Sequence, residues 1–146
     1  MKVLVFKPEL CNGCRICEET CAQTWFKETN AEKSAIRICE SPEEPGHYCA
    51  VVCNQCGECM DVCPTLALRR DKHGIVRLSK TLCVGCLSCV GFCPSEAMFV
   101  HADYTAPFKC VTCGKCVEAC PTGALEVQDM PPVALTETEK RMKVVA

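Results

Sequence analysis

The residues of this chain that can do chemistry are its cysteines, which number 18 among 146 residues. Sixteen of them form four runs with one spacing, C-x-x-C-x-x-C-x-x-x-C. Thiolates are soft ligands, and such a run supplies three of them to one [4Fe–4S] cluster and the fourth to a neighbouring cluster. Sixteen thiolates at four per cluster therefore predict four [4Fe–4S] clusters. The predicted ligands are Cys11, Cys14, Cys17, Cys21; Cys53, Cys56, Cys59, Cys63; Cys83, Cys86, Cys89, Cys93; and Cys110, Cys113, Cys116, Cys120.

Glycine stands beside the second cysteine of every run. Gly13 and Gly85 directly precede it, whereas Gly57 and Gly114 directly follow it. A loop that wraps tightly around a cluster needs positive φ angles or close backbone approach, which glycine allows. The four glycines are therefore predicted to be structural parts of the ligand loops.

A second motif, C-P-[ST]-x-A-[LM], follows the fourth cysteine at 63–68, 93–98 and 120–125. Proline fixes the turn that leaves the ligand loop, and the small and apolar residues after it can pack inward. The first run has no such proline, so a helix is predicted from Arg15 to about Glu28. Trp25 and Phe26 lie on that helix and are predicted to pack in the core.

The remaining elements are predicted to be short, which indicates an α+β fold. A hairpin is expected from 66 to 79 around a turn at 71–74, and a loop from 40 to 46. The polar segment 136–143 is a candidate helix that either docks on a partner or frays. Further strands are expected at 3–7, 35–39, 98–104 and 124–128.

Two other readings of so many cysteines are disfavoured. A disulfide scaffold spaces its cysteines irregularly, and the residues before Pro8 include no apolar stretch of signal-peptide length. Zinc ribbons use two C-x-x-C pairs per ion rather than four-cysteine runs that end in Cys-Pro.

Charge and hydropathy restrict the partners. Four clusters, each 2− with its thiolates, would shift the formal charge of −2 to about −10, which disfavours nucleic acid. No apolar run approaches the ~20 residues of a spanning helix, so no transmembrane segment and a cytoplasmic location are expected. The chain has one Trp, two Tyr and five Phe, so its core is small and the apo-protein is expected to be largely unfolded.

Few other residues suggest chemistry. Cys39 and Cys49 lie outside the runs and are predicted to be buried free thiols, with a spare ligand or a reactive thiol as the alternatives. The three histidines are scattered, and His73 lies in a predicted exposed turn. No catalytic triad, phosphate loop or carboxylate pair stands out, so the chain is predicted not to be an enzyme.

Spacing alone leaves the pairing of the runs open. The runs can pair sequentially, first with second and third with fourth, or in a nested order, first with fourth and second with third. Linkers of 31, 19 and 16 residues separate the successive runs, and they allow both arrangements.

Four successive runs of which the first lacks proline resemble the four-cluster electron-transfer subunits of larger oxidoreductases, over Cys11 to Leu125. This resemblance implies two nested ferredoxin-like dicluster modules: 1–46 with 100–130 outside, 47–99 inside, and a tail at 131–146. The implied ligand sets are Cys11, Cys14, Cys17, Cys120; Cys21, Cys110, Cys113, Cys116; Cys53, Cys56, Cys59, Cys93; and Cys63, Cys83, Cys86, Cys89.

The resemblance also implies the function: relay of single electrons between a catalytic subunit and another carrier or a flavin subunit. That family serves tungsten, molybdenum and nickel enzymes. The unstretched second run is more similar to the compact subunits of soluble complexes, such as tungsten-dependent aldehyde oxidoreductases or carbon monoxide dehydrogenase, and the tungsten enzyme is the preferred partner. The alternatives are a subunit of a carbon monoxide dehydrogenase or hydrogenase, a free-standing polyferredoxin, a membrane-linked respiratory subunit and a cluster-storage module. A cluster with a full set of ligands in a loop fixed by proline is expected to be retained rather than handed on, which disfavours the storage module.

Overall fold

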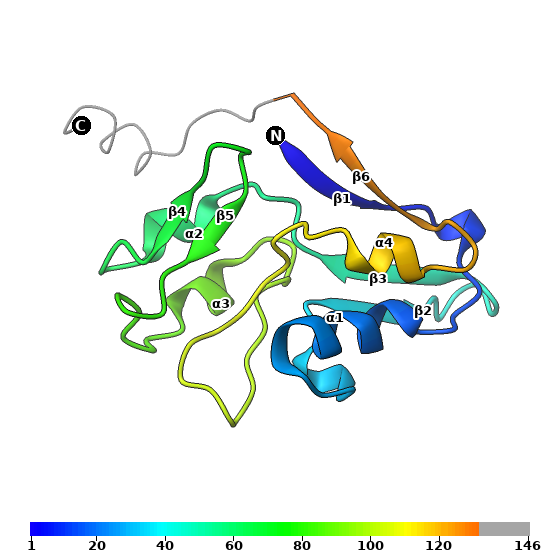
Figure 1. Ribbon diagram of the computed structural model, residues 1–146, viewed down its shortest axis with the longest axis horizontal. Helices are drawn as coiled ribbons and strands as arrows, with labels where there is room; N and C mark the ends of the chain where they lie inside the picture. Colours follow the sequence, from blue (N-terminus) through cyan, green and yellow to red (C-terminus); the bar gives the residue numbers. More distant parts are fainter. Residues whose placement is uncertain (132–146) are drawn as a thin grey trace.

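The computed structural model describes residues 1–131, and its elements fall into two halves (Figure 1). One half contains the paired strands β1 (Lys2–Phe6) and β6 (Leu125–Asp129), the hairpin β2 (Ile36–Glu40) and β3 (Tyr48–Val52), and two helices, α1 (Ile16–Phe26) and α4 (Lys115–Ala119). The other half contains the hairpin β4 (Leu68–Arg70) and β5 (Val76–Leu78) with helices α2 (Glu58–Val62) and α3 (Ser88–Phe92). Short 3₁₀ helices, η1 (Pro8–Leu10) and η2 (Ala31–Lys33), connect elements of the first half.

Long-range pairing brings the two ends of the described chain together. β1 pairs antiparallel with β6 in a register that places Leu4 opposite Val127. The amino group of Met1 donates to Asp129 Oδ1 at 2.8 Å. Helix α1 packs against α4, and α2 packs against α3. The first run therefore lies beside the fourth, and the second beside the third.

Each half has a small core of its own, to which the cysteines contribute. Leu4, Ile36 and Leu125 pack with the buried thiols of the first half, Cys17 and Cys116. In the other half Cys59 and Cys89 pack with the buried apolar residues Met60, Leu68, Val76 and Met98. Thiols thus occupy positions that aliphatic side chains would fill in an ordinary domain.

Proline sets the helix lengths. α2, α3 and α4 have five residues each and end one residue before the cysteine that precedes a proline. The first run has no proline, and α1 continues through Cys21 for eleven residues in all. A proline disfavours helical φ and ψ in the residue before it, which explains the difference. The helix predicted from the missing proline is thereby confirmed.

The structure corrects two predictions about these elements and adds a strand that was not predicted. The segment 98–104 is not a strand: only Phe99 bridges to Phe108, and the chain turns where Tyr104 N–H donates to His101 O. Strand β3 was not expected. Trp25 is 49% exposed instead of buried.

The other sequence predictions in this region have clear outcomes. Phe26 packs as expected, with ring centroids 4.9 Å from Tyr104 and 5.1 Å from Phe108. The hairpin with its turn at 71–74 is confirmed, and His73 is exposed. The segment 136–143 lies outside the described residues.

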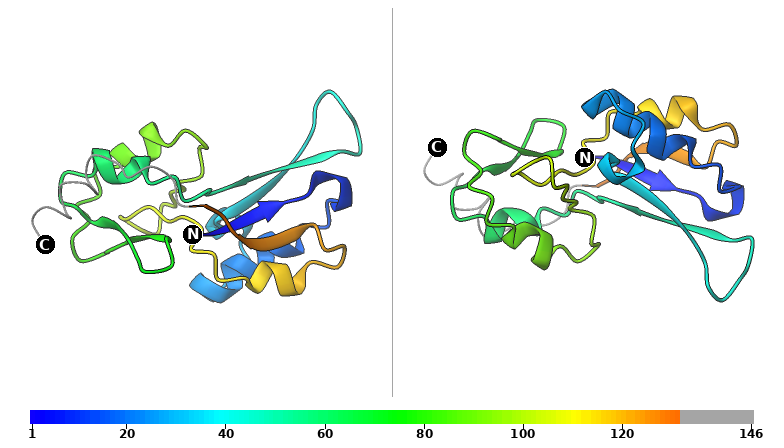
Figure 2. Two further views of the ribbon diagram at one scale, coloured as in Figure 1. Left: turned by 90° about the horizontal axis from the view of Figure 1, so that it is seen from above. Right: turned by 90° about the horizontal axis from the view of Figure 1, so that it is seen from below.

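The two cysteines outside the runs are not free thiols. Cys39 and Cys49 face each other across the β2–β3 hairpin and form a disulfide, with their Cα atoms 5.2 Å apart. Neither residue is buried, because this hairpin extends away from the body of the molecule (Figure 2). The prediction of buried thiols failed because it did not include β3.

Candidate iron–sulfur sites

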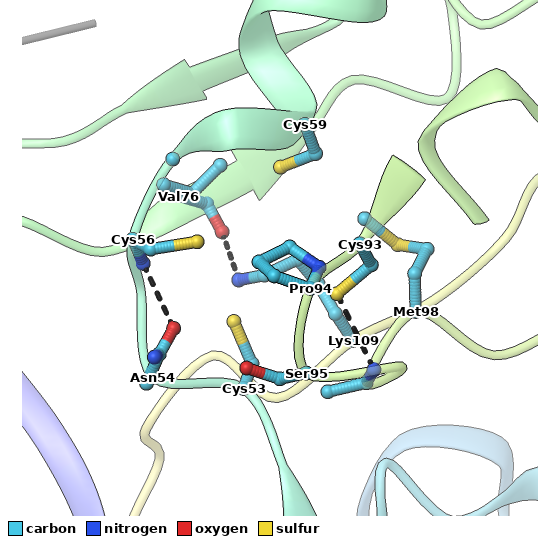
Figure 3. Close-up of a pocket in the computed structure, with 12 residues that line it drawn as sticks. Cys53, Asn54, Cys56, Cys59, Val76, Cys93, Pro94, Ser95, Met98 and Lys109 are labelled. Carbon is cyan, nitrogen blue, oxygen red and sulfur yellow. Dashed lines mark hydrogen bonds between the residues drawn. The ribbon is translucent and has the colours of Figure 1, made fainter. Parts of the chain in front are cut away.

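Three cavities are each lined by four cysteines. The first is lined by Cys53, Cys56, Cys59 and Cys93 (Figure 3). The second is lined by Cys21, Cys110, Cys113 and Cys116. The third is lined by Cys63, Cys83, Cys86 and Cys89.

The composition of these cavities follows one rule. Each takes the first three cysteines of one run and the fourth cysteine of another. Of the remaining four cysteines, Cys17 is buried in the core of the first half, Cys11 and Cys120 are half-buried and pack against that core, and Cys14 is exposed. Among residues 1–131, no three Cys, His, Asp or Glu side chains lie close enough to hold a single metal ion.

The same backbone conformation recurs in all four ligand loops. The residue before the second cysteine has a positive φ in every run: 74° for Gly13, 61° for Gln55, 73° for Gly85 and 55° for Thr112. The residue after that cysteine also has a positive φ, and the helix begins just beyond it. The four residues at this second position are Arg15, Gly57, Leu87 and Gly114.

This pattern explains the glycines. All four predicted glycines have positive φ, which confirms the prediction that they shape the loops. At the matching positions without glycine, the structure places ordinary side chains in the left-handed region, which is costly for L-residues. Contacts elsewhere must compensate for that cost, and Gln55 makes such contacts.

Backbone N–H groups converge on the thiols. Gly13, Gln55 and Thr112 donate to the first cysteine of their runs at 3.3–3.4 Å. Such hydrogen bonds stabilise the charged thiolate, and hydrogen bonds to sulfur also tune cluster potentials. At Cys53 and Cys110 burial outweighs these bonds, and the pKa of both thiols is raised.

The C-P-[ST]-x-A motif serves the fourth cysteine. The N–H of its alanine donates to that thiol at 3.3 Å, from Ala67 to Cys63 and from Ala97 to Cys93. The hydroxyl of the motif also lies near the sulfur, with Thr65 Oγ1 3.7 Å from Cys63 Sγ. The motif thus ends the helix and also places two hydrogen-bond donors, an N–H and a hydroxyl, near one thiol.

The first run obtains the same donor by another route. Cys21 lies inside α1 and has no alanine three residues after a proline. Instead the N–H of Ala35, which precedes β2, donates to Cys21 Sγ at 3.3 Å. Sequence reasoning missed this residue because fourteen positions separate the two partners.

Electrostatics divide the thiols into two groups. Burial raises the pKa of the third cysteine of three runs, Cys17, Cys59 and Cys116, to about 12. For Cys63, burial also acts to raise the pKa, but the Ala67 N–H and the Thr65 hydroxyl outweigh it and the pKa is lowered. A metal cluster must replace protons at the buried thiols, so its binding is coupled to proton release.

Sequence comparisons identify the binding segments. Residues 52–97 and 75–121 each match a 4Fe-4S dicluster domain, and residues 8–24 match a 4Fe-4S binding domain. The chain is a ferredoxin-like iron–sulfur protein. It binds multiple 4Fe-4S clusters, as its cysteine runs predict.

Relatives of this ferredoxin-like chain include subunits of several oxidoreductases. It is 37% identical over 99 residues to the uncharacterized ferredoxin-like protein YdhX of Escherichia coli, covering 62% of this chain and 44% of that protein. It is 36% identical over 96 residues to the polyferredoxin-like subunit of aliphatic sulfonate oxidoreductase from Pyrococcus furiosus, covering 64% of this chain and 54% of the other. The thiosulfate reductase electron transfer subunit PhsB of Salmonella typhi is 29% identical over 107 residues, 68% of this chain and 55% of its own length. The chain thus spans about half the length of these relatives.

Solved structures share the fold. The active site complex BamBC of benzoyl coenzyme A reductase, as isolated, aligns with a TM-score of 0.52 and 22% sequence identity. The alignment covers 99% of this chain and 87% of that one. Within residues 1–131, no helix is long and apolar enough to cross a bilayer.

Proposed function

We propose that this chain holds four [4Fe–4S] clusters and relays single electrons between the catalytic subunit of an oxidoreductase and a second redox partner. The observation that carries the proposal is the set of three cavities, each lined by four cysteines from two runs. A bound cluster supplies one-electron chemistry at such a site. The chain supplies thiolates, N–H donors and a buried environment, and it takes no part in making or breaking bonds of a substrate.

The proposed ligand sets follow the cavities. They are Cys53, Cys56, Cys59, Cys93; Cys21, Cys110, Cys113, Cys116; and Cys63, Cys83, Cys86, Cys89. By the same rule, three cysteines of one run and the fourth of its neighbour, the fourth set is Cys11, Cys14, Cys17 and Cys120. The packing of Cys11, Cys17 and Cys120 in one core supports this assignment.

The proposed modules are nested. The outer module comprises residues 1–46 with 100–130, and the inner one residues 47–99. The pairing of β1 with β6 and the packing of α1 against α4 support this division. β3, at the start of the inner range, pairs with β2 of the outer range and forms a continuous connection between them.

The proposed electron path has an order. The set that includes Cys11 lies at one end, the set that includes Cys63 at the other, and the sets that include Cys21 and Cys53 lie between them. One buried residue, Lys109, lines both of the middle cavities, which supports their adjacency. Electrons would then enter at one end and leave at the other, each hop moving one electron without a change in bonding.

The proposed partner is a larger catalytic subunit, with a tungsten-dependent aldehyde oxidoreductase as the first choice and a molybdenum or nickel enzyme as the alternative. The names of the relatives, which include subunits of a sulfonate oxidoreductase and a thiosulfate reductase, support an oxidoreductase partner. The cytoplasmic location stays a prediction, which anaerobic fractionation of native cells would check.

Anaerobic affinity purification of this chain from native extract, with metal analysis, tests the proposal. We expect a stoichiometric large subunit that contains tungsten, molybdenum or nickel, and about sixteen irons on this chain. A lone chain with about sixteen irons would make it a free-standing polyferredoxin. An iron content of about eight or fewer would refute the four-cluster assignment.

A further inference from the structure

A buried lysine lies between two of the proposed cluster sites. Lys109 is 8% exposed and directly precedes Cys110. It is the residue common to the cavity lined by Cys53 and the cavity lined by Cys110. Figure 3 shows its side chain entering the first cavity, with its amine directed to the carbonyl of Val76.

The amine of Lys109 is held by neutral acceptors. Its Nζ donates to Val76 O at 2.6 Å, to Gln55 Oε1 at 2.9 Å and to Cys110 O at 2.9 Å. An ammonium group has three donors, so these three bonds use all of them. None of the three acceptors is charged, and the positive charge therefore remains available to act on the nearby sulfurs.

Gln55 fixes the position of this ammonium. It is fully buried, and its Oε1 accepts from both Lys109 Nζ and the N–H of Val76. Its Nε2 donates to Cys110 O at 2.9 Å and to Thr112 Oγ1 at 3.3 Å. Both the oxygen and the nitrogen of the Gln55 amide therefore have hydrogen-bond partners in a single side-chain orientation. These bonds connect the second run to the fourth through a rigid polar contact.

The other buried lysine of the described chain is different. Lys33 is 2% exposed, but its Nζ contacts two carboxylates, Glu28 at 2.8 Å and Asp103 at 2.9 Å. Its charge is neutralised locally, and it lines none of the three cysteine cavities. The described chain thus contains one buried lysine whose charge is balanced by carboxylates and one, Lys109, that is held by neutral acceptors and lines two cysteine cavities.

A positive charge near a cluster favours the state with one more electron. Burial lowers the local dielectric response, so the interaction is stronger than it would be at the surface. Cluster potentials depend on net charge, hydrogen bonding and exposure around the sulfurs. Because Lys109 lies beside two sites, one charge acts on both.

We propose that Lys109 raises the reduction potentials of the two middle clusters. These two clusters then accept an electron more readily from the cluster at either end of the path. The proposal rests on the four-cluster assignment above. In the step concerned, one electron leaves a reduced donor and arrives at a middle cluster, and the same electron then passes to the next oxidised centre. Gln55 acts as the positioning residue for the ammonium.

Three variants test this role. Lys109→Gln removes the charge and keeps hydrogen-bond donors, Lys109→Arg keeps the charge, and Lys33→Gln removes a buried charge away from the cysteine cavities. Iron content and EPR-monitored anaerobic redox titration are measured for each variant and for the unsubstituted chain.

We expect Lys109→Gln to retain its iron and to lower two cluster potentials. The equilibrium constant for reduction of each should fall about tenfold, which is about 59 mV for one electron. Lys109→Arg and Lys33→Gln should leave the potentials unchanged.

Two outcomes would overturn the proposal. One is a fully loaded Lys109→Gln chain whose potentials are all unchanged. The other is loss of iron from Lys109→Gln while Lys109→Arg loads normally, since the charge would then serve folding rather than potential. The iron content of the unsubstituted chain separately tests the four-cluster assignment.

Discussion

The N–H of Ala35 donates to Sγ of Cys21 at 3.3 Å, across fourteen positions of the chain. In the second and third runs the corresponding donor is only four positions away, as with Ala67 and Cys63. The fourth ligand therefore receives a hydrogen bond in all three of these runs, although only two of them contain the proline motif.

Ala35→Pro should remove this donor, because proline has no N–H. We expect the Cys21 thiolate to lose about 1–2 kcal/mol of stabilisation. The cluster at Cys21 should then have a lower reduction potential and should lose iron faster to a chelator. Ala35→Gly, which keeps the N–H, is the matched control. Equal behaviour of the two variants would show that the hydrogen bond does not affect the cluster.

Single-cysteine variants should separate ligands from non-ligands. Cys59→Ser removes a buried thiol that lines a cavity, and about four irons should be lost because a cube needs its ligand set. Cys39→Ser, outside the three cysteine-lined cavities, should retain all iron. Iron analysis of anaerobically purified protein checks both, and equal iron in the two variants would contradict the ligand assignment.

The Cys39–Cys49 disulfide should stabilise the β2–β3 hairpin without serving the clusters. Its two cysteines are ten positions apart, a short loop for which the entropic gain is about 2–3 kcal/mol. Cys49→Ser should therefore lower stability by about that amount in anaerobic denaturant unfolding, with unchanged visible absorbance. A change in the iron–sulfur absorbance would instead connect this hairpin to the cluster sites.

Removal of iron should unfold most of the chain. Helices α2, α3 and α4 have five residues each, whereas an isolated helix needs about 12–15 residues to be even marginal in water. Anaerobic treatment with an iron chelator should abolish most of the far-UV circular dichroism, with iron and ellipticity lost together. Retention of the full helical signal after complete iron loss would contradict this prediction.

Cluster loading should release protons and weaken as the pH falls. Burial raises the pKa of Cys17, Cys59 and Cys116 to about 12 in the folded geometry, and in an unfolded chain a thiol has a pKa of about 8.5. In both states these thiols carry protons at neutral pH, and a cluster that binds thiolates must displace them. Proton displacement favours loading at higher pH, which reconstitution in weakly buffered solutions with a pH electrode would measure. Loading without proton release would count against it.

Local chemistry made much of this protein predictable. The cysteine spacing gave the candidate ligands, glycine gave the loop positions with positive φ, and proline gave the short helices. The absence of proline after Cys21 gave the longer α1. Each of these features depends on residues within a few positions of one another, so their geometry can be inferred from the sequence.

Contacts between distant segments decided the rest. Spacing allowed two pairings of the runs, and only the packing of α1 on α4 and of α2 on α3 shows which runs lie together. The same holds for the Cys39–Cys49 disulfide, which requires β3, and for the exposure of Trp25. Lys109 and Gln55 are 54 positions apart, and nothing in their local sequence marks them as partners. The sequence by itself predicted which cysteines are the candidate ligands, because each run is local. Only the tertiary structure decided which charges and donors surround those cysteines, because burial and electrostatics depend on the whole fold.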